Sequence, residues 1–193
     1  MSQLDSIFAI TAIDGRYRSK VENLAHITSE FGLIKYRTAV ECQWVLFLSD
    51  CEEIPEIPSL DKEDRAFVAA IAANFDAVGA TRIKEIEATT NHDVKAVEYY
   101  LKEQFALRPN LQAINEWVHF GCTSEDINNT SYSLMINRAV DGPISKNLSE
   151  LSCLLKDLAS ATKHMPMLSL THGQPATTST LGKEIAVFHN RLE

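Results

Sequence analysis

Glycine and proline are scarce in this sequence. The 193 residues include 7 glycines and 6 prolines, about half of what average usage, about 7% and about 5%, would give. Both residues form turns and end helices, so their scarcity argues against a fold of many short strands and tight turns. It favours long helices with few breaks.

Cysteine pairs, excess positive charge and long apolar runs are absent too. The four cysteines contain no C-x-x-C pair, which argues against a zinc knuckle. A net charge of −8 repels phosphate backbones and anionic membranes, so neither nucleic acid nor a membrane is an expected partner. The longest apolar run, residues 67–73, is too short for a bilayer, and the start lacks a signal-peptide pattern. We expect a cytoplasmic protein with reduced thiols.

The remaining composition, 45% hydrophobic and 23% charged, is that of an ordinary folded protein. Apolar residues recur at helical spacing, and no stretch sustains a strand-like alternation. The pattern predicts an all-α fold with helices over residues 19–51, 61–75, 77–89, from 93, 111–121, 123–139, 143–164 and from 180.

Two features of the chain suggest its organisation. The break “LRPNL” predicts a boundary between an N-terminal helical domain, residues 1–110, and the first part of a central helical-bundle domain, residues 111–193. The last residues, “FHNRLE”, fall inside a helical pattern without a Gly or Pro stop signal. We therefore expect the bundle to be truncated.

Four polar clusters interrupt the helices, and two of them lie in the first half. In “DGRYR”, Arg16 and Tyr17 adjoin a glycine turn. A guanidinium pairs two phosphate oxygens at once, so this cluster is either a phosphate grip or a solvated turn. In “TTNHD”, Asn91, His92 and Asp93 are suitable helix caps, but His92 is also a candidate ligand contact. The residue types leave both alternatives open.

The other two clusters follow in the second half. In “TSED”, Thr123 and Ser124 stand at a predicted helix start, where backbone N–H groups favour anions. The same residues fit a capping pattern that needs no ligand. In “THGQPAT”, His172 is a candidate general acid or base, since imidazole exchanges protons near neutral pH. Thr171 and Gln174 are candidates to orient a carboxylate or the imidazole, although a His-Gly pair is also an ordinary turn.

One further histidine, His119, lies in an apolar helical context, and we expect it in the core. With Cys122 it offers two ligand types that zinc uses. No second pair supports such a site. We therefore expect no metal and no cofactor.

Taken in order, “DGRY”, “TTNHDVKAVEY”, “HFGCTSEDINN” and “THGQPAT” resemble the N-terminal part of the bacterial adenylosuccinate lyase family, within the fumarase/aspartase superfamily. The resemblance extends from about residue 8 to the end, and Leu170 stands where members often carry arginine. It implies β-elimination of fumarate from adenylosuccinate, giving AMP, and from succinyl-aminoimidazole-carboxamide ribotide in purine biosynthesis. It also implies a homotetramer.

The same resemblance implies roles for the polar residues. His172 would be the general acid. Substrate contacts would lie at the phosphate (Arg16, Tyr17), along the site (Asn91, His92, Asp93) and at the succinyl group (Thr123, Ser124, Thr171, Gln174). The family's general base is a serine on a loop with an S-S-x-M-P-x-K-x-N signature, which this sequence lacks. We therefore predict that the 193 residues alone do not turn over substrate.

Two alternatives remain beside this interpretation. Another lyase of the superfamily, of the argininosuccinate lyase or aspartase type, would perform the same elimination on a different substrate. A non-catalytic helical module would use the same surface for ligand binding or oligomerisation.

Overall fold

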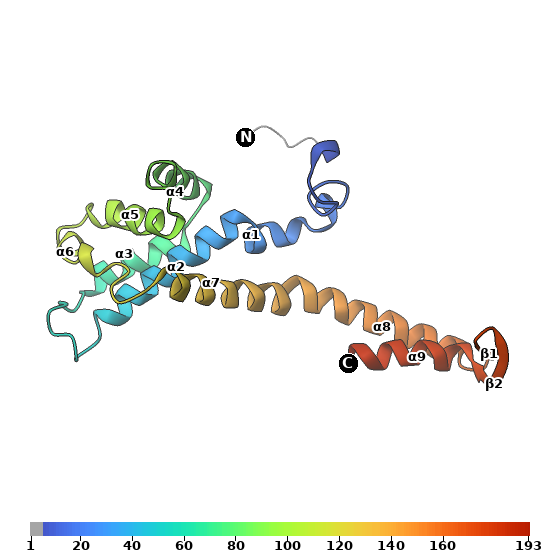
Figure 1. Ribbon diagram of the computed structural model, residues 1–193. Helices are drawn as coiled ribbons and strands as arrows, with labels where there is room; N and C mark the ends of the chain where they lie inside the picture. The colour runs from blue at the N-terminus through green and yellow to red at the C-terminus, as the bar shows by residue number, and fades with distance from the viewer. Residues whose placement is uncertain (1–5) are drawn as a thin grey trace. The chain divides into compact units, whose positions relative to one another are not determined.

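The structure is a computed structural model that describes residues 6–193, and its contacts divide the chain into two compact units. The first unit ends at Ala139, and the second comprises Val140–Glu193. Helices make up most of the regular structure of both units (Figure 1). The predicted all-α fold is confirmed, with one small hairpin added to it.

The first unit consists of helices joined by turns and loops, the longest of them between α2 and α3. Its α-helices are α1 (Ala25–Thr28), α2 (Glu30–Leu48), α3 (Lys62–Ala73), α4 (Ala77–Thr90), α5 (Asp93–Phe105), α6 (Pro109–Gln112) and α7 (Ser124–Ala139). Its 3-10 turns cover Ser6–Phe8, Arg18–Lys20, Glu22–Leu24 and Asn115–Trp117. Side-chain caps start several helices: Asp61 accepts the backbone N–H of Asp64 before α3, and Asp76 accepts that of Gly79 in α4. These starts lie close to the predicted ones because a cap is a local signal.

The prediction of one continuous helix over residues 19–51 is wrong in its first part. The chain forms two 3-10 turns and the short α1 before Ser29, which is extended at ψ 175°. The Ser29 hydroxyl accepts the backbone N–H of Gly32 at 3.3 Å and so starts α2. Gly32 lies against the backbone of Ile27, where a Cβ would collide. The bend therefore depends on a cap and a close approach that helical spacing does not reveal.

The core of the first unit includes residues beyond position 110. Its fully buried side chains include Ile83, Leu101, Phe105, Leu111 and Ile114. The last two belong to α6 and the turn that follows, where the apolar spacing predicts a single helix over 111–121. Because they pack into the same core as α5, the compact units divide after residue 139. The boundary between an N-terminal domain, residues 1–110, and the first part of a bundle domain, residues 111–193, stays a prediction.

The second unit is a pair of helices joined by a β-hairpin. A kinked turn, Val140–Ile144, leads into α8 (Ser145–Thr162), and then follow β1 (Pro166–Thr171), β2 (Gln174–Thr180) and α9 (Leu181–Leu192). The Thr180 hydroxyl caps α9 by accepting the backbone N–H of Lys183 at 3.2 Å. Helices α8 and α9 approach closely at Gly182, which lies against the backbone of Lys163.

The hairpin is a correction to the sequence pattern, which predicts a loop around “THGQPAT”. Strands β1 and β2 pair antiparallel, with a shift in register between Leu168 and Leu170. The two-residue turn is formed by His172 and Gly173, at φ 50° and 77°. Positive φ at both positions is what a type I′ hairpin turn requires. The strands escape prediction because the shift interrupts alternation and most of their side chains are exposed.

Candidate active site

The segment Asn91–Asp93 connects α4 to α5 and combines capping with exposure. Asn91 ends α4 in the left-handed conformation, at φ 50°. Nδ1 of His92 accepts the backbone N–H of Lys95 at 3.1 Å, so the capping role of His92 is confirmed. A neutral ring that accepts at Nδ1 carries its proton on Nε2. The side chain of His92 is 51% exposed, which leaves the rest of the ring open to a ligand.

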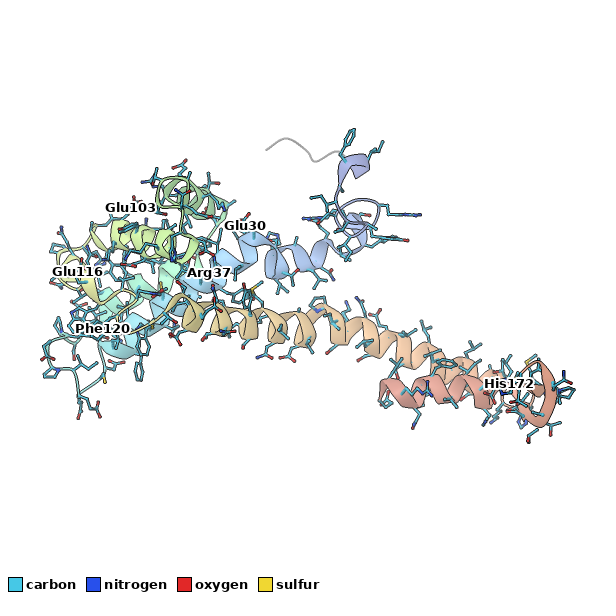
Figure 2. The ribbon with its side chains drawn as sticks, viewed as in Figure 1. Glu30, Arg37, Glu103, Glu116, Phe120 and His172 are labelled. Carbon is cyan, nitrogen blue, oxygen red and sulfur yellow. The ribbon has the colours of Figure 1, made fainter. Side chains whose placement is uncertain are left out.

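Asp93 forms an ion pair with Arg37 of α2. Its Oδ2 accepts from Nη2 of Arg37 at 2.6 Å, and its Oδ1 accepts the backbone N–H of Val94 at 2.9 Å. Partial burial raises the pKa of the Asp93 carboxyl, but these bonds outweigh it and hold that pKa below its ordinary value. Nε of Arg37, labelled in Figure 2, donates to Oδ1 of Asn128 in α7 at 2.9 Å. The guanidinium therefore joins the start of α5 to α7.

Thr123 and Ser124 lie at the N-terminus of α7. The backbone N–H and the hydroxyl of Thr123 both donate to Oδ2 of Asp126, at 2.7 Å and 2.8 Å. Ser124 is half-buried, and its hydroxyl has no hydrogen-bond partner among residues 6–193. A capped helix start with a free hydroxyl can also receive an anion on its first backbone N–H groups. Capping and ligand binding are thus compatible at this position.

A carboxylate–imidazole pair immediately precedes that helix start. Oε1 of Glu41, which is fully buried in α2, lies 2.5 Å from Nδ1 of His119. Burial raises the pKa of Glu41, and the contact with His119 opposes this shift. The prediction that His119 packs in the core is wrong: the side chain is 19% exposed, and its backbone is left-handed at φ 64°. Across the described residues, no group of three or more His, Cys, Asp or Glu side chains could hold a metal ion.

Arg16 and Tyr17 lie in the turn that precedes the first long helices. The Arg16 guanidinium lies over the Tyr17 ring, 5.1 Å from its centroid. The neighbouring Arg18 is engaged by Glu22 at 2.9 Å and by Asp14 at 3.5 Å, whereas Arg16 has no carboxylate partner in the described part of the chain. Arg16 is therefore the arginine of this cluster that remains available to a phosphate.

The remaining candidates lie at the tip of the hairpin in the second unit. Thr171 and Gln174 are opposite each other in the β1–β2 ladder, and His172 occupies the exposed turn between them (Figure 2). The turn holds the three side chains in one local group. It also holds His172 in a left-handed conformation, which residues other than glycine adopt seldom and asparagine, aspartate and histidine adopt more often than the rest.

Within the first unit, buried polar residues of α2 and α7 connect two of the predicted clusters. Arg37 links the cluster at 91–93 to Asn128 of α7, the helix at whose start the cluster at 123–124 lies. No hydrogen bond or ion pair among the described residues joins Arg16 to either of them. Nothing in the sequence pattern distinguishes Arg37, Glu41 or Asn128 as functional residues. Arg37 and Glu41 are opposite charges one turn apart in α2, a helix that also carries Glu30 and Lys35.

Two of the polar segments thus stand at helix starts of the first unit, and another stands at the hairpin tip of the second unit. A sequence model of the lyase family matches residues 15–193, and the chain belongs to this lyase family. It is similar to the adenylosuccinate lyases of Vibrio cholerae, Haemophilus influenzae and Escherichia coli, at 51%, 48% and 48% identity over 191 residues. The resemblance seen in the four polar segments is confirmed.

These matches also define how much of the relatives the chain represents. Each alignment covers 99% of this chain and 42% of the relative, so the chain spans less than half the length of these proteins. Among solved structures, the fold is similar to 3-carboxy-cis,cis-muconate lactonizing enzyme from Pseudomonas putida, with a TM-score of 0.66 and 23% identity over 89% of this chain and 36% of that one. A fumarate lyase from Mesorhizobium gives a TM-score of 0.66 at 19% identity, over 89% and 37%. At these identities the likeness establishes the fold alone.

Proposed function

We propose that this chain supplies the substrate-binding part and the general acid of a carbon–nitrogen lyase that eliminates fumarate from adenylosuccinate to give AMP. The observation that carries the proposal is the 48–51% identity to adenylosuccinate lyases across nearly the whole chain. All the polar segments that resemble this family lie inside the matched residues. The same elimination on succinyl-aminoimidazole-carboxamide ribotide is the second proposed activity.

The reaction accounts for the residue types. A base takes a proton from the carbon beside a carboxylate, and negative charge builds on that carboxylate as the carbon–nitrogen bond breaks. Hydrogen-bond donors must therefore stand ready for the carboxylate, and the departing nitrogen needs a proton from an acid. His172 is the proposed acid, because its imidazole is exposed at the turn between Thr171 and Gln174.

The remaining roles follow the local chemistry of each segment. Ser124 offers its hydroxyl, unpaired among residues 6–193, to the succinyl carboxylates, beside Thr123 at the start of α7. Thr171 and Gln174 offer a hydroxyl and a side-chain amide from the hairpin. Arg16, stacked on Tyr17, grips the phosphate. The nucleotide between the phosphate and the succinyl group is lined by Asn91, His92 and Asp93. A serine outside these 193 residues is the proposed base.

We also propose that the working enzyme is a cytoplasmic homotetramer. Large apolar side chains of α8 and α9 are exposed, including Leu154 at 66% and Phe188 at 60%. Exposed apolar stripes of this kind mark surfaces that pack against other helices. In residues 6–193 no single helix is long and apolar enough to cross a membrane. Within the same residues, α3 and α4 are the only pair of helices that together reach that length and apolarity, and the pair is bent by 86°.

Cleavage assays test the proposal directly. The full-length product of the gene that carries this sequence is expected to release fumarate from adenylosuccinate and from the succinyl-carboxamide ribotide. Argininosuccinate and aspartate serve as controls, and faster release of fumarate from either would assign the enzyme to another lyase of the superfamily. The purified 193-residue chain is expected to be inactive, and measurable cleavage by it would contradict the assignment of the base to a segment outside it.

A further inference from the structure

Helix α2 carries two charged residues that are buried one turn apart. Arg37 is 5% exposed and Glu41 is 0% exposed. Neither pairs with the other within the distance of a salt bridge, and each makes its polar contacts with a different segment of the first unit. Thr38 between them is also buried, but its hydroxyl bonds only the backbone of Ile34 in the same helix. Unlike Thr38, the two charged residues therefore make their polar contacts outside α2, and the helix does not need these contacts to form.

Arg37 connects the start of α5 to α7. Its Nη2 donates to Asp93, the first residue of α5, at 2.6 Å, and its Nε donates to Asn128 of α7 at 2.9 Å. Asn128 donates in turn to Oε1 of Glu125 at 2.8 Å, which places this chain of bonds in the first turn of α7. The planar guanidinium fixes the direction of both bonds at once.

Glu41 holds the loop that leads into α7. Its Oε1 contacts Nδ1 of His119, and its Oε2 is buried without a hydrogen-bond partner. A buried carboxylate oxygen left unpaired is costly, and so is a left-handed backbone at a histidine. Both features occur where the chain turns towards Thr123, so the local conformation is maintained at the expense of stability.

Buried charged pairs are weak contributors to stability, and apolar residues of similar size often serve a core as well. Their strength lies in fixed geometry. We propose that Arg37 and Glu41 are positioning residues, which hold the 91–93 segment and the 119–124 segment in one mutual arrangement for the substrate. Arg37 sets the distance between the two helix starts, and Glu41 sets the loop before α7. The catalytic part of this inference rests on the proposed lyase function.

The test compares Arg37→Lys with a matched control in the full-length protein. Lysine keeps the charge but cannot direct two bonds in one plane. The control is Arg108→Lys, because Arg108 also bonds a buried carboxylate, Asp64, at 2.5 Å, and neither residue contacts the predicted site. For adenylosuccinate, Arg37→Lys is expected to lower kcat/KM by about 10–100-fold, since small misplacements of binding groups have effects of this size. For Arg108→Lys, kcat/KM is expected to stay within about threefold of the wild-type value, although its Tm changes by a comparable amount.

Amide hydrogen exchange gives a readout that does not depend on activity. Arg37→Lys is expected to speed exchange at the backbone N–H groups of Lys95 and Thr123, which are bonded at the two helix starts, and Arg108→Lys to leave both unchanged. A wild-type protein without cleavage activity would overturn the proposed function, and the exchange rates would still decide the positioning role. Unchanged exchange at both amides, or equal losses of kcat/KM in the two variants, would overturn the inference.

Two further variants extend the test to each residue separately. Should Arg37→Lys fail to fold, Asn128→Ala removes one of the two bonds of Arg37. It is expected to lower kcat/KM and to speed amide exchange in the same way, but by smaller factors. Glu41→Gln is expected to speed exchange at Thr123 but not at Lys95, because Glu41 contacts only the loop before α7. An equal effect at both amides would contradict the division of roles between Arg37 and Glu41.

Discussion

The carboxylate of Asp126 reaches back one turn and accepts two bonds from Thr123, from the backbone N–H at 2.7 Å and from the hydroxyl at 2.8 Å. The first bond is half of the reciprocal cap that the sequence pattern predicts. In the second, the threonine hydroxyl donates to the carboxylate instead of accepting a backbone N–H. The helix start is thus secured by the charged form of Asp126.

This arrangement predicts the acid titration of the helix start. The backbone and hydroxyl bonds from Thr123 lower the pKa of Asp126 below its ordinary value of 3.8. A carboxyl whose pKa is lower in the folded state stabilises the fold above its unfolded pKa, and this contribution is lost as the pH falls through the folded pKa. NMR titration of the Asp126 carboxyl should show a midpoint below 3.8, shifted upwards in Thr123→Val. A wild-type midpoint at or above 3.8 would contradict the assigned bonds.

How far the sequence predicts the structure depends on how local each feature is. The starts of α3, α4 and α7 were predictable because Asp61, Asp76 and Thr123 are caps that act within four residues. The bonds of Arg37 were not, because they join residues 56 and 91 positions apart in the sequence. Only packing brings such partners together.

The hairpin shows the same division at the candidate site. The motif around His172 predicted a candidate acid from the residue type, which is a property of the sequence. Its position at a tight turn depends on the pairing of β1 with β2, whose register shift and exposed faces leave no alternation to detect. Residue types were therefore predictable at this site, and their arrangement was not.

The cysteines of the 193-residue chain should differ in reactivity. Burial, and secondarily the charge of Glu41, raise the pKa of the Cys42 thiol to about 12, and the thiolate is the reactive form. Cys153 is exposed. Iodoacetamide at pH 8 should alkylate Cys153 in the native chain and Cys42 only after unfolding, as mass spectrometry of the peptides would report. Equal native rates at the two positions would contradict the burial of Cys42.

The role of His172 can be separated from the conformation of its turn. In the full-length protein, His172→Ala should lower kcat by about 10²–10⁴-fold, the usual contribution of a general acid. His172→Asn tolerates the left-handed backbone and should lose as much activity, because an amide cannot donate the proton. Tm should change little in His172→Asn, since the side chain is exposed, and should fall further in His172→Ala, because alanine is strained at a positive φ. Activity of His172→Asn within tenfold of wild type would remove His172 from the role of acid.

The proposed phosphate grip predicts a different kinetic pattern. Arg16 contacts a part of the substrate that does not react, so its bond contributes equally to the ground state and the transition state. Arg16→Ala should therefore raise KM more than it lowers kcat. Arg18→Ala is the matched control, because Arg18 is already paired with Glu22 and Asp14, and its KM should stay close to wild type. An unchanged KM in Arg16→Ala would count against the grip.

The packing of α9 on α8 predicts that a helix-favouring substitution will destabilise the second unit. Gly182→Ala should gain about 1 kcal/mol of helix propensity. The added Cβ, however, would lie 2.6 Å from the backbone nitrogen of Lys163, and overpacking of this kind costs about 1–3 kcal/mol. Backbone cannot rotate away as a side chain can, so we expect the collision to prevail and the free energy of unfolding to fall.

The control is Asn190→Ala, at an exposed position of the same helix, which should not lower the free energy of unfolding. Urea unfolding followed by circular dichroism compares the two variants. A Gly182→Ala variant as stable as Asn190→Ala would show that α8 and α9 can move apart at little cost.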